Sequence, residues 1–299
     1  MSTAADLATV KSILLAIPLL VVAAGAVQSQ KATPGKGETE VQLMVRPHAG
    51  DTLWLQLEQT TDTKNITAPP ERQSVYGPVR EHAETQTVEM HMFAHSLVES
   101  SDSEVAVLSA TTDSLNVRTG SGGRLGESHP VAVASADRTI HVRVTHDGAM
   151  SVVDSRSGAS AVEASLQGMP AMLPSKPVTV GDQWERQIAF PSVPMIGMRA
   201  DAVVHADFKF DSLTRNGRLA YVSMKGTLRR TGAARDLAPG TQLVTSGLLR
   251  GFLMLDRIRG WITEAETVIQ VQSEITARRN DKSPTRSVYI RLIQRMKIR

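Results

Sequence analysis

The stretch "SVYIRLIQRMKIR" at residues 287–299 decides the fold class of this chain. Its even positions are apolar apart from Gln294, and its odd positions from residue 291 onward are mostly basic. A period of two residues is that of a β-strand with one buried and one exposed face. We therefore expect the apolar set to be buried and the basic set to form an exposed stripe, which is the candidate interaction surface. The apolar set is Val288, Ile290, Leu292, Met296 and Ile298, and the basic stripe is Arg291, Arg295, Lys297 and Arg299.

The same alternation is present upstream of this strand. Apolar side chains alternate with acidic or amide ones from Trp261 to Ile275, and the turn cluster "RRNDKSPT" follows at residues 278–285. Short connections between consecutive strands predict an antiparallel meander. The fold class is therefore mainly β, and the meander forms a large curved sheet, a half-barrel or a sandwich. Further strands are expected near residues 41–46, 52–60, 84–98, 104–111, 138–145, 183–190, 198–210, 217–230 and 241–258.

One short helix is expected in the middle of the chain. In "GASAVEASLQGMPAMLP" at residues 158–174, Val162, Leu166 and Met169 have the spacing of one helix face. This segment would join two halves, 41–157 and 170–299. A faint internal repeat supports that division, because "RPHAGDTLWLQL" (46–57) and "PVTVGDQWERQI" (177–188) share a proline, a Gly-Asp pair and a tryptophan. We expect both Asp residues to cap turns and both tryptophans, Trp54 and Trp184, to fill the core.

The N-terminus carries an apolar run that is either a signal peptide or an uncleaved membrane anchor. About 15 residues at ~1.5 Å each give ~22 Å, which is short of the ~30 Å bilayer core. Together with the small-residue site at Ala24-Gly25-Ala26, this length favours cleavage. Residues 7–10 could instead extend the helix while Lys11 reaches the interface. The anchor residues would be Ile13, Leu14, Leu15, Ile17, Leu19, Leu20, Val21 and Val22.

Both interpretations place the rest of the chain outside the cytoplasm, because Lys11 precedes the apolar run. The expected organisation is residues 1–27 as signal or anchor, 28–40 as a flexible tether and 41–299 as an extracytoplasmic β domain. The expected location is the periplasmic side of the inner membrane, or the periplasm itself if the signal is cleaved.

Composition restricts the chemistry available to the chain. Hydrophobic residues make up 41% of it, enough for a core, and the absence of cysteine excludes disulfides, thiolate metal sites and a lipid-modified N-terminal cysteine. Residues 1–198 carry 14 Lys and Arg against 21 Asp and Glu, a net −7, and residues 199–299 carry 19 against 9, a net +10, which together give +3. The basic residues alternate along strands with few aromatic neighbours, so nucleic acid is not an expected partner.

The segment "VEMHMFAH" at residues 88–95 contains ligand-type side chains. As a helix it could share a metal between His91 and His95, with Met92 as a copper(I) ligand. As a strand it places the two histidines ~13 Å apart, too far for one metal. The alternation and the flanking threonines favour the strand, with Val88, Met90, Met92 and Ala94 on the core face. We therefore expect no metal site.

One mid-chain segment and a later strand pair carry a recognisable pattern, formed by Leu173, Pro174, Pro177, Val178, Val180, Gly181, Asp182 and Trp184, and further on by Gly251, Asp256 and Gly260. On these residues the chain resembles an uncharacterised family of secreted bacterial β-proteins. The resemblance spans most of residues 41–299 and implies an extracytoplasmic β domain without an assigned activity. Family members often carry a lipobox cysteine, which this chain lacks.

No sequence motif of catalysis is present. The chain has no zinc-protease helix, nucleophile elbow, phosphate loop or dinucleotide fingerprint. We expect no enzyme and no cofactor. One hypothesis is an accessory or structural subunit of a larger membrane protein complex, such as a bioenergetic or light-harvesting assembly. The alternative is a carrier or binding module for an apolar ligand or lipid in the periplasm, which an apolar cavity of several hundred Å³ within the sheet would favour.

Overall fold

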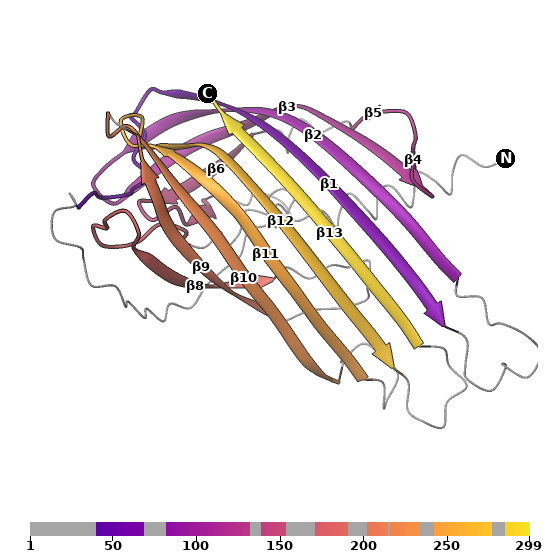
Figure 1. Cartoon of the computed structure of the whole chain (residues 1–299). Coiled ribbons are helices and arrows are strands. Elements are labelled where there is room, and N and C mark those ends of the chain that lie inside the picture. Colours follow the sequence, from indigo (N-terminus) through magenta and orange to yellow (C-terminus); the bar gives the residue numbers. More distant parts are fainter. Residues whose placement is uncertain are drawn as a thin grey trace, which may run out of the picture.

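The computed structural model describes residues 40–68, 82–131, 139–153, 171–190, 202–214, 216–233, 242–276 and 285–299. They form one antiparallel sheet of 13 strands that does not close into a barrel (Figure 1). The strands are β1 (Thr52–Ala68), β2 (His82–Ser101), β3 (Val105–Ser121), β4 (Arg124–Leu125), β5 (His129–Pro130), β6 (Thr139–Thr145), β7 (Met150–Val152), β8 (Gln183–Phe190), β9 (Ala202–Leu213), β10 (Leu219–Ala233), β11 (Gln242–Asp256), β12 (Trp261–Thr276) and β13 (Thr285–Ile298).

Two meanders make up the sheet. Its order is β7-β6-β3-β2-β1-β13-β12-β11-β10-β9-β8, so the first and the last long strands pair at its centre. The predicted fold class, mainly β with a curved antiparallel meander, is confirmed. The described strands form an open sheet, because β7 and β8 at its two edges do not pair with each other. The described residues contain no helix. Both predicted helices, at the N-terminus and around Val162, Leu166 and Met169, lie outside the described residues.

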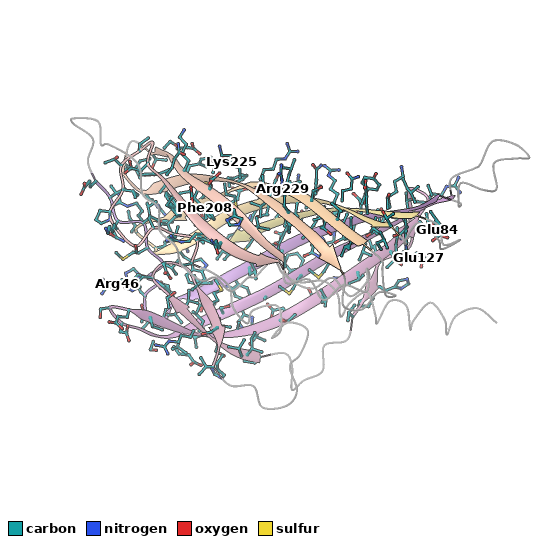
Figure 2. All side chains as sticks on the ribbon, turned by 90° about the horizontal axis from the view of Figure 1, so that it is seen from below. Arg46, Glu84, Glu127, Phe208, Lys225 and Arg229 are labelled. Carbon is teal, nitrogen blue, oxygen red and sulfur yellow. The ribbon has the colours of Figure 1, made fainter. Side chains whose placement is uncertain are left out.

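The sheet curves so strongly that its two halves face each other (Figure 2). We call these halves the arms: one runs from β7 to β1 and the other from β13 to β8 in the strand order. Figure 2 shows Phe208 of β9 pointing between the arms, whereas Lys225 and Arg229 of β10 point outward. At one end the arms share a single hydrophobic core, which includes Val144 of β6 and Phe208. Because this core draws on both meanders, each half buries part of its apolar face against the other, and a second, smaller cluster of Leu57, Val88, Met90, Met92 and Val117 lies within β1–β3.

Two segments outside the sheet fill this end, which we call the closed end. Leu43 and Leu173 are fully buried there, each with 0% exposure. The first segment was predicted as a strand over residues 41–46, but it forms only an isolated bridge between Val41 and Val178. The backbone N–H of Val45 donates to the carbonyl of His146 at 2.8 Å. The closed end is therefore sealed between the arms by residues 41–46 and 171–178.

The two Gly-Asp pairs of the internal repeat form equivalent turns. Asp51 Oδ2 accepts the N–H of His48 at 3.2 Å, and Asp182 Oδ2 accepts that of Thr179 at 2.8 Å. The preceding glycines have φ angles of 89° and 100°, in the left-handed region that glycine adopts without steric cost. The prediction that both Asp residues cap turns is confirmed.

The prediction for the paired tryptophans is correct for one and wrong for the other. Trp184 is 3% exposed, whereas Trp54 is 57% exposed. Trp184 stands two residues after its turn Asp, but Trp54 stands three residues after Asp51. Since side chains alternate along a strand, the extra residue moves Trp54 to the outer face, and Leu53 occupies the inward position instead.

The C-terminal strand β13 follows its predicted alternation. Its even residues share the concave face with odd residues of β1, for example Ile290 opposite Thr63. Val288 and Leu292 are buried, while Ile290 and Ile298 are half-buried and pack against the core.

Candidate functional site

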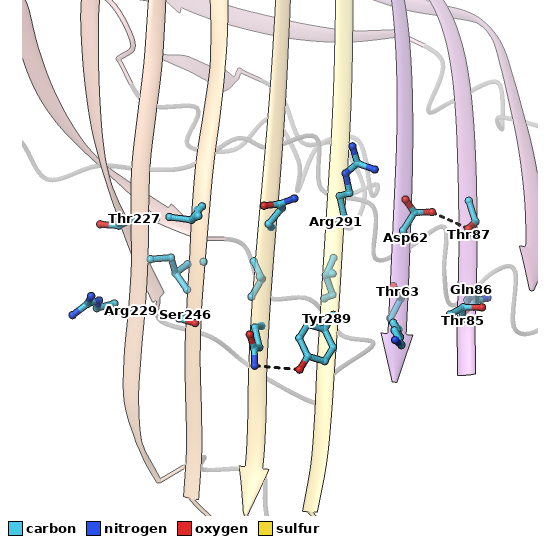
Figure 3. Close-up of a pocket in the computed structure, with 18 of the residues that line it drawn as sticks. Asp62, Thr63, Thr85, Gln86, Thr87, Thr227, Arg229, Ser246, Tyr289 and Arg291 are labelled. Atoms are coloured by element: carbon cyan, nitrogen blue, oxygen red, sulfur yellow. Dashed lines mark hydrogen bonds between the residues drawn. The ribbon is translucent and has the colours of Figure 1, made fainter. Parts of the chain in front are cut away.

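A cavity of about 720 Å³ lies away from the closed end. It contacts β10, β11, β12, β13, β1 and β2 at one level, where paired residues are aligned across the six strands (Figure 3). Because one cavity touches all six neighbouring strands, we place it on the concave face of the curved sheet. We call this hollow the trough. The inward-facing residues at its level are Leu228, Gly247, Val271, Ile290, Thr63 and Gln86.

The wall of the trough formed by β10–β13 is apolar. Leu228, Val271 and Ile290 line it, and the next inward level adds the buried Leu249, Ile269 and Leu292. Gly247 completes this wall, and a Cβ there would lie 2.8 Å from the carbonyl oxygen of Gln270. The strand backbone at Gly247 therefore approaches β12 closely, and no side chain at this position occupies the trough.

The wall formed by β1 and β2 is polar at the level of the cavity, whereas Val88, Met90 and Met92 make the inward face of β2 apolar toward the closed end. Thr63 and Gln86 face the trough, and Thr61 and Gln59 follow on the same face of β1 toward the closed end. Gln59 is 3% exposed, and its Oε1 atom has no hydrogen-bond partner. A buried acceptor without a donor is uncommon in folded proteins because its desolvation is uncompensated.

The described residues contain no arrangement that resembles a metal centre. Within them, no group of three or more His, Cys, Asp or Glu side chains could hold a metal ion. The segment around His91 and His95 is a strand, as predicted, with Val88, Met90, Met92 and Ala94 buried on the concave face. Both histidines lie on the convex face, where His95 contacts Asp113 at 2.8 Å.

The basic stripe of β13 is exposed on the convex face, but two of its four residues are paired. Arg295 Nε donates to Glu266 Oε2 at 2.8 Å, and Lys297 Nζ lies 4.0 Å from Glu264 Oε1. The hydrogen bond with Glu266 raises the pKa of the Arg295 guanidinium. These pairs offset part of the positive charge. Use of Arg291, Arg295, Lys297 and Arg299 as an interaction surface therefore stays a prediction, as does the accessory-subunit role that depends on it.

The residues that carry the family resemblance build the closed end, not the trough. Val178, Gly181 and Asp182 form the bridge and the turn described above, and Trp184 Nε1 donates to the carbonyl of Met172 at 2.8 Å. Asp256 binds the β11–β12 turn, and Gly260 accepts the backbone N–H of Arg46 at 2.7 Å. None of these residues lines the cavity.

Sequence reasoning placed Ile290 on the inward face but missed the polar and glycine residues of the trough. Thr63, Gln86 and Gly247 belong to no motif, and their common face is set by pairing between strands far apart in sequence. One local signal was present: threonine and glycine occupy inward positions where the alternation calls for large apolar side chains. The N-terminal anchor residues lie outside the described part of the chain, and no helix within that part is long and apolar enough to cross a membrane.

Comparison with models of protein families finds no match, and comparison with curated proteins finds none either. Among solved structures, the chain is similar to lipovitellin, in a structure that describes lipid–protein interactions, with a TM-score of 0.43 and 10% identity. That match covers 82% of this chain and 25% of the lipovitellin chain. An outer membrane channel from Pseudomonas putida F1 is similar with a TM-score of 0.23 and 11% identity, over 90% of this chain and 100% of the channel.

This chain thus spans about a quarter of the lipovitellin chain that it matches. Both TM-scores are too low for the function of either protein to bear on this one.

Proposed function

We propose that the protein is a non-enzymatic binding module that holds an apolar chain in the trough, outside the cytoplasm. The observation that carries this proposal is the cavity of about 720 Å³ against the apolar wall of β10–β13. Small-molecule sites in proteins have volumes of roughly 300–1,000 Å³ and are lined mainly by hydrophobic side chains. A cavity within the sheet is also the feature that separates the carrier hypothesis from the accessory-subunit hypothesis.

The apolar wall can supply the binding energy for such a chain. Each CH₂ group removed from water contributes about 0.8 kcal/mol. The wall spans four strands at ~4.8 Å spacing, so it presents a surface about 14 Å wide across the strands. Leu228, Val271 and Ile290 form this surface and have no polar side-chain atom. An alkyl chain laid across them would lose water without leaving a polar group unpaired.

The fold gives the trough one sealed end. Residues 41–46 and 171–178 fill the closed end between the arms. At the opposite end, the exposed Glu84 and Arg286 stand on the concave face of β2 and β13. Arg286 Nη2 donates to Asn65 Oδ1 at 3.4 Å. We infer that a ligand enters from this side, past these polar residues.

Filling the trough should weaken binding. The Ile290→Trp variant places a larger side chain in the cavity, and we expect affinity for a long-chain fluorescent probe to fall at least about tenfold, since a 1.4 kcal/mol loss equals one such factor. Fluorescence titration of the purified chain measures this. Ile293→Trp is the matched control, because Ile293 lies on the convex face of the same strand. Equal affinity in both variants and the wild type would contradict the proposal.

A further inference from the structure

The two walls of the trough differ in chemistry, and this difference bears on the class of ligand. The inward residues of β10–β13 at the two central levels are aliphatic or glycine, for example Leu228, Val271 and Leu292. At the same levels, β1 presents Thr61 and Thr63, and β2 presents Gln86 and the apolar Val88. A purely apolar ligand would bury those hydroxyl and amide groups without partners, which costs free energy.

We propose that the ligand is an uncharged amphipathic lipid with free hydroxyl groups, and this proposal rests on the function proposed above. Its chain lies across β10–β13, and its hydroxyl-bearing end lies against β1 and β2. Threonine hydroxyls both donate and accept hydrogen bonds, and glutamine amides do the same. The hydroxyl groups of a polyol can therefore form hydrogen bonds with both the donors and the acceptors of this wall.

The side chain of Gln59 indicates that the ligand carries a hydrogen-bond donor. Its Oε1 atom is buried, has no hydrogen-bond partner, and belongs to the inward face of β1 beyond Thr61. It lies two inward positions past Thr63, the last inward residue of β1 that lines the cavity, so the polar end of the ligand has to extend past the cavity to reach it. An ester or hydrocarbon end has no hydrogen to offer this oxygen, whereas a hydroxyl has one. Gln294 of β13 stands opposite Gln59 on the same face and adds a second amide. This pair of amides extends the polar wall toward the closed end.

The concave face also argues against a charged ligand end. Glu84 and Arg286, of opposite sign, stand at the end of the trough opposite the closed end, which we call the mouth. In the described parts of β1, β2, β11, β12 and β13, no charged side chain faces inward between the mouth and the closed end. A carboxylate or phosphate held against the inward face of these five strands would be desolvated without a counter-ion on that face, which is costly. The charged residues that border the cavity, Asp62, Lys64, Arg229 and Arg291, belong to the outward face of their strands. A neutral polar end meets no such penalty.

Three probes of equal chain length test the proposal: a long-chain monoacylglycerol, the corresponding fatty-acid methyl ester and the fatty acid at neutral pH. Each competes with the fluorescent probe on the wild-type chain. We expect the monoacylglycerol to bind about tenfold more tightly than the methyl ester, because hydrogen bonds to buried partners account for such a factor. The fatty acid should bind more weakly than the monoacylglycerol.

Gln59→Met separates recognition from folding. Methionine is similar in size and removes the unpartnered oxygen, so we expect an unchanged or raised thermal midpoint. Monoacylglycerol affinity should fall about tenfold, while methyl ester affinity should stay within about twofold. Gln56→Met, on the convex face of the same strand, should alter neither. Equal losses for both ligands, or no loss, would overturn the assignment of Gln59.

The outcomes also distinguish this proposal from the one on which it rests. If the monoacylglycerol and the methyl ester bind equally well, the trough holds apolar chains without reading the hydroxyl groups, and only this inference fails. If none of the three probes binds, the proposed function itself fails.

Discussion

The Trp184→Ala variant is expected to lose about 4 kcal/mol of unfolding free energy, a value typical of large aromatic residues removed from a core. Trp184 is 3% exposed, and its ring stacks on Phe208 with centroids 5.8 Å apart. Its Nε1 atom also donates to the carbonyl of Met172, so the substitution leaves that acceptor without its donor. Because Met172 belongs to a segment that seals the closed end, the loss should affect both arms. Urea unfolding followed by circular dichroism measures the change.

Trp54→Ala is the matched control for this prediction. Trp54 also follows a Gly-Asp turn, but it lies on the convex face, where its ring contacts His95 with a centroid distance of 5.3 Å. It is 57% exposed, so its removal should cost about 1 kcal/mol or less, as is usual for surface positions. Comparable losses in the two variants would contradict the face assignment.

The contrast between these tryptophans shows how far the sequence alone predicts the fold. Strand positions and faces followed from alternation wherever a strand alternates without interruption, as in β13 and around Met90. The Gly-Asp repeat predicted both turns correctly. It did not predict Trp54, because a difference of one residue between turn and ring reverses the face of the sheet. The face on which a side chain lies therefore depends on the number of residues between it and the preceding turn.

The trough could not have been predicted in the same way. It depends on the pairing of β1 with β13, which are separated by most of the chain, and on the curvature of the sheet. Thr63 and Ile290 become neighbours only through that pairing. The motifs that carried the family resemblance mark turns and close backbone contacts at the closed end. A residue such as Thr63, polar on an inward face, has no such local signature.

Asp256 provides the second large expected effect, and it depends on pH. Its side chain is 2% exposed and accepts hydrogen bonds from Arg218, at 2.8 Å from Nε and 2.7 Å from Nη2. Two backbone N–H groups of the β11–β12 turn, those of Ile258 and Arg259, donate to its other oxygen at 3.0 and 3.1 Å. Burial raises the pKa of the Asp256 carboxyl, but the hydrogen bonds from Arg218 and the two N–H groups outweigh it, and the pKa falls below its ordinary value.

A carboxyl whose pKa is lower in the folded than in the unfolded chain stabilises the fold above the unfolded pKa, which is about 3.9 for Asp. This contribution is lost as pH falls through the folded pKa. Asp256→Asn should therefore reduce the unfolding free energy by about 2 kcal/mol at neutral pH, the usual value of hydrogen bonds to a charged group, because Arg218 is itself about half exposed and the pair is not fully buried. The difference from the wild type should shrink progressively as the pH falls below about 4. Urea unfolding at a series of pH values measures it.

Asp207→Asn on the convex face of β9 is the control, and it should change stability by about 0.5 kcal/mol or less, since the residue is not buried. The pH dependence separates an electrostatic role of Asp256 from a packing role. Asparagine has nearly the shape of aspartate, so a loss caused by packing would persist unchanged into acid. If Asp256→Asn loses the same unfolding free energy at neutral pH and well below pH 4, the charge on Asp256 does not stabilise the contact between the β11–β12 turn and Arg218.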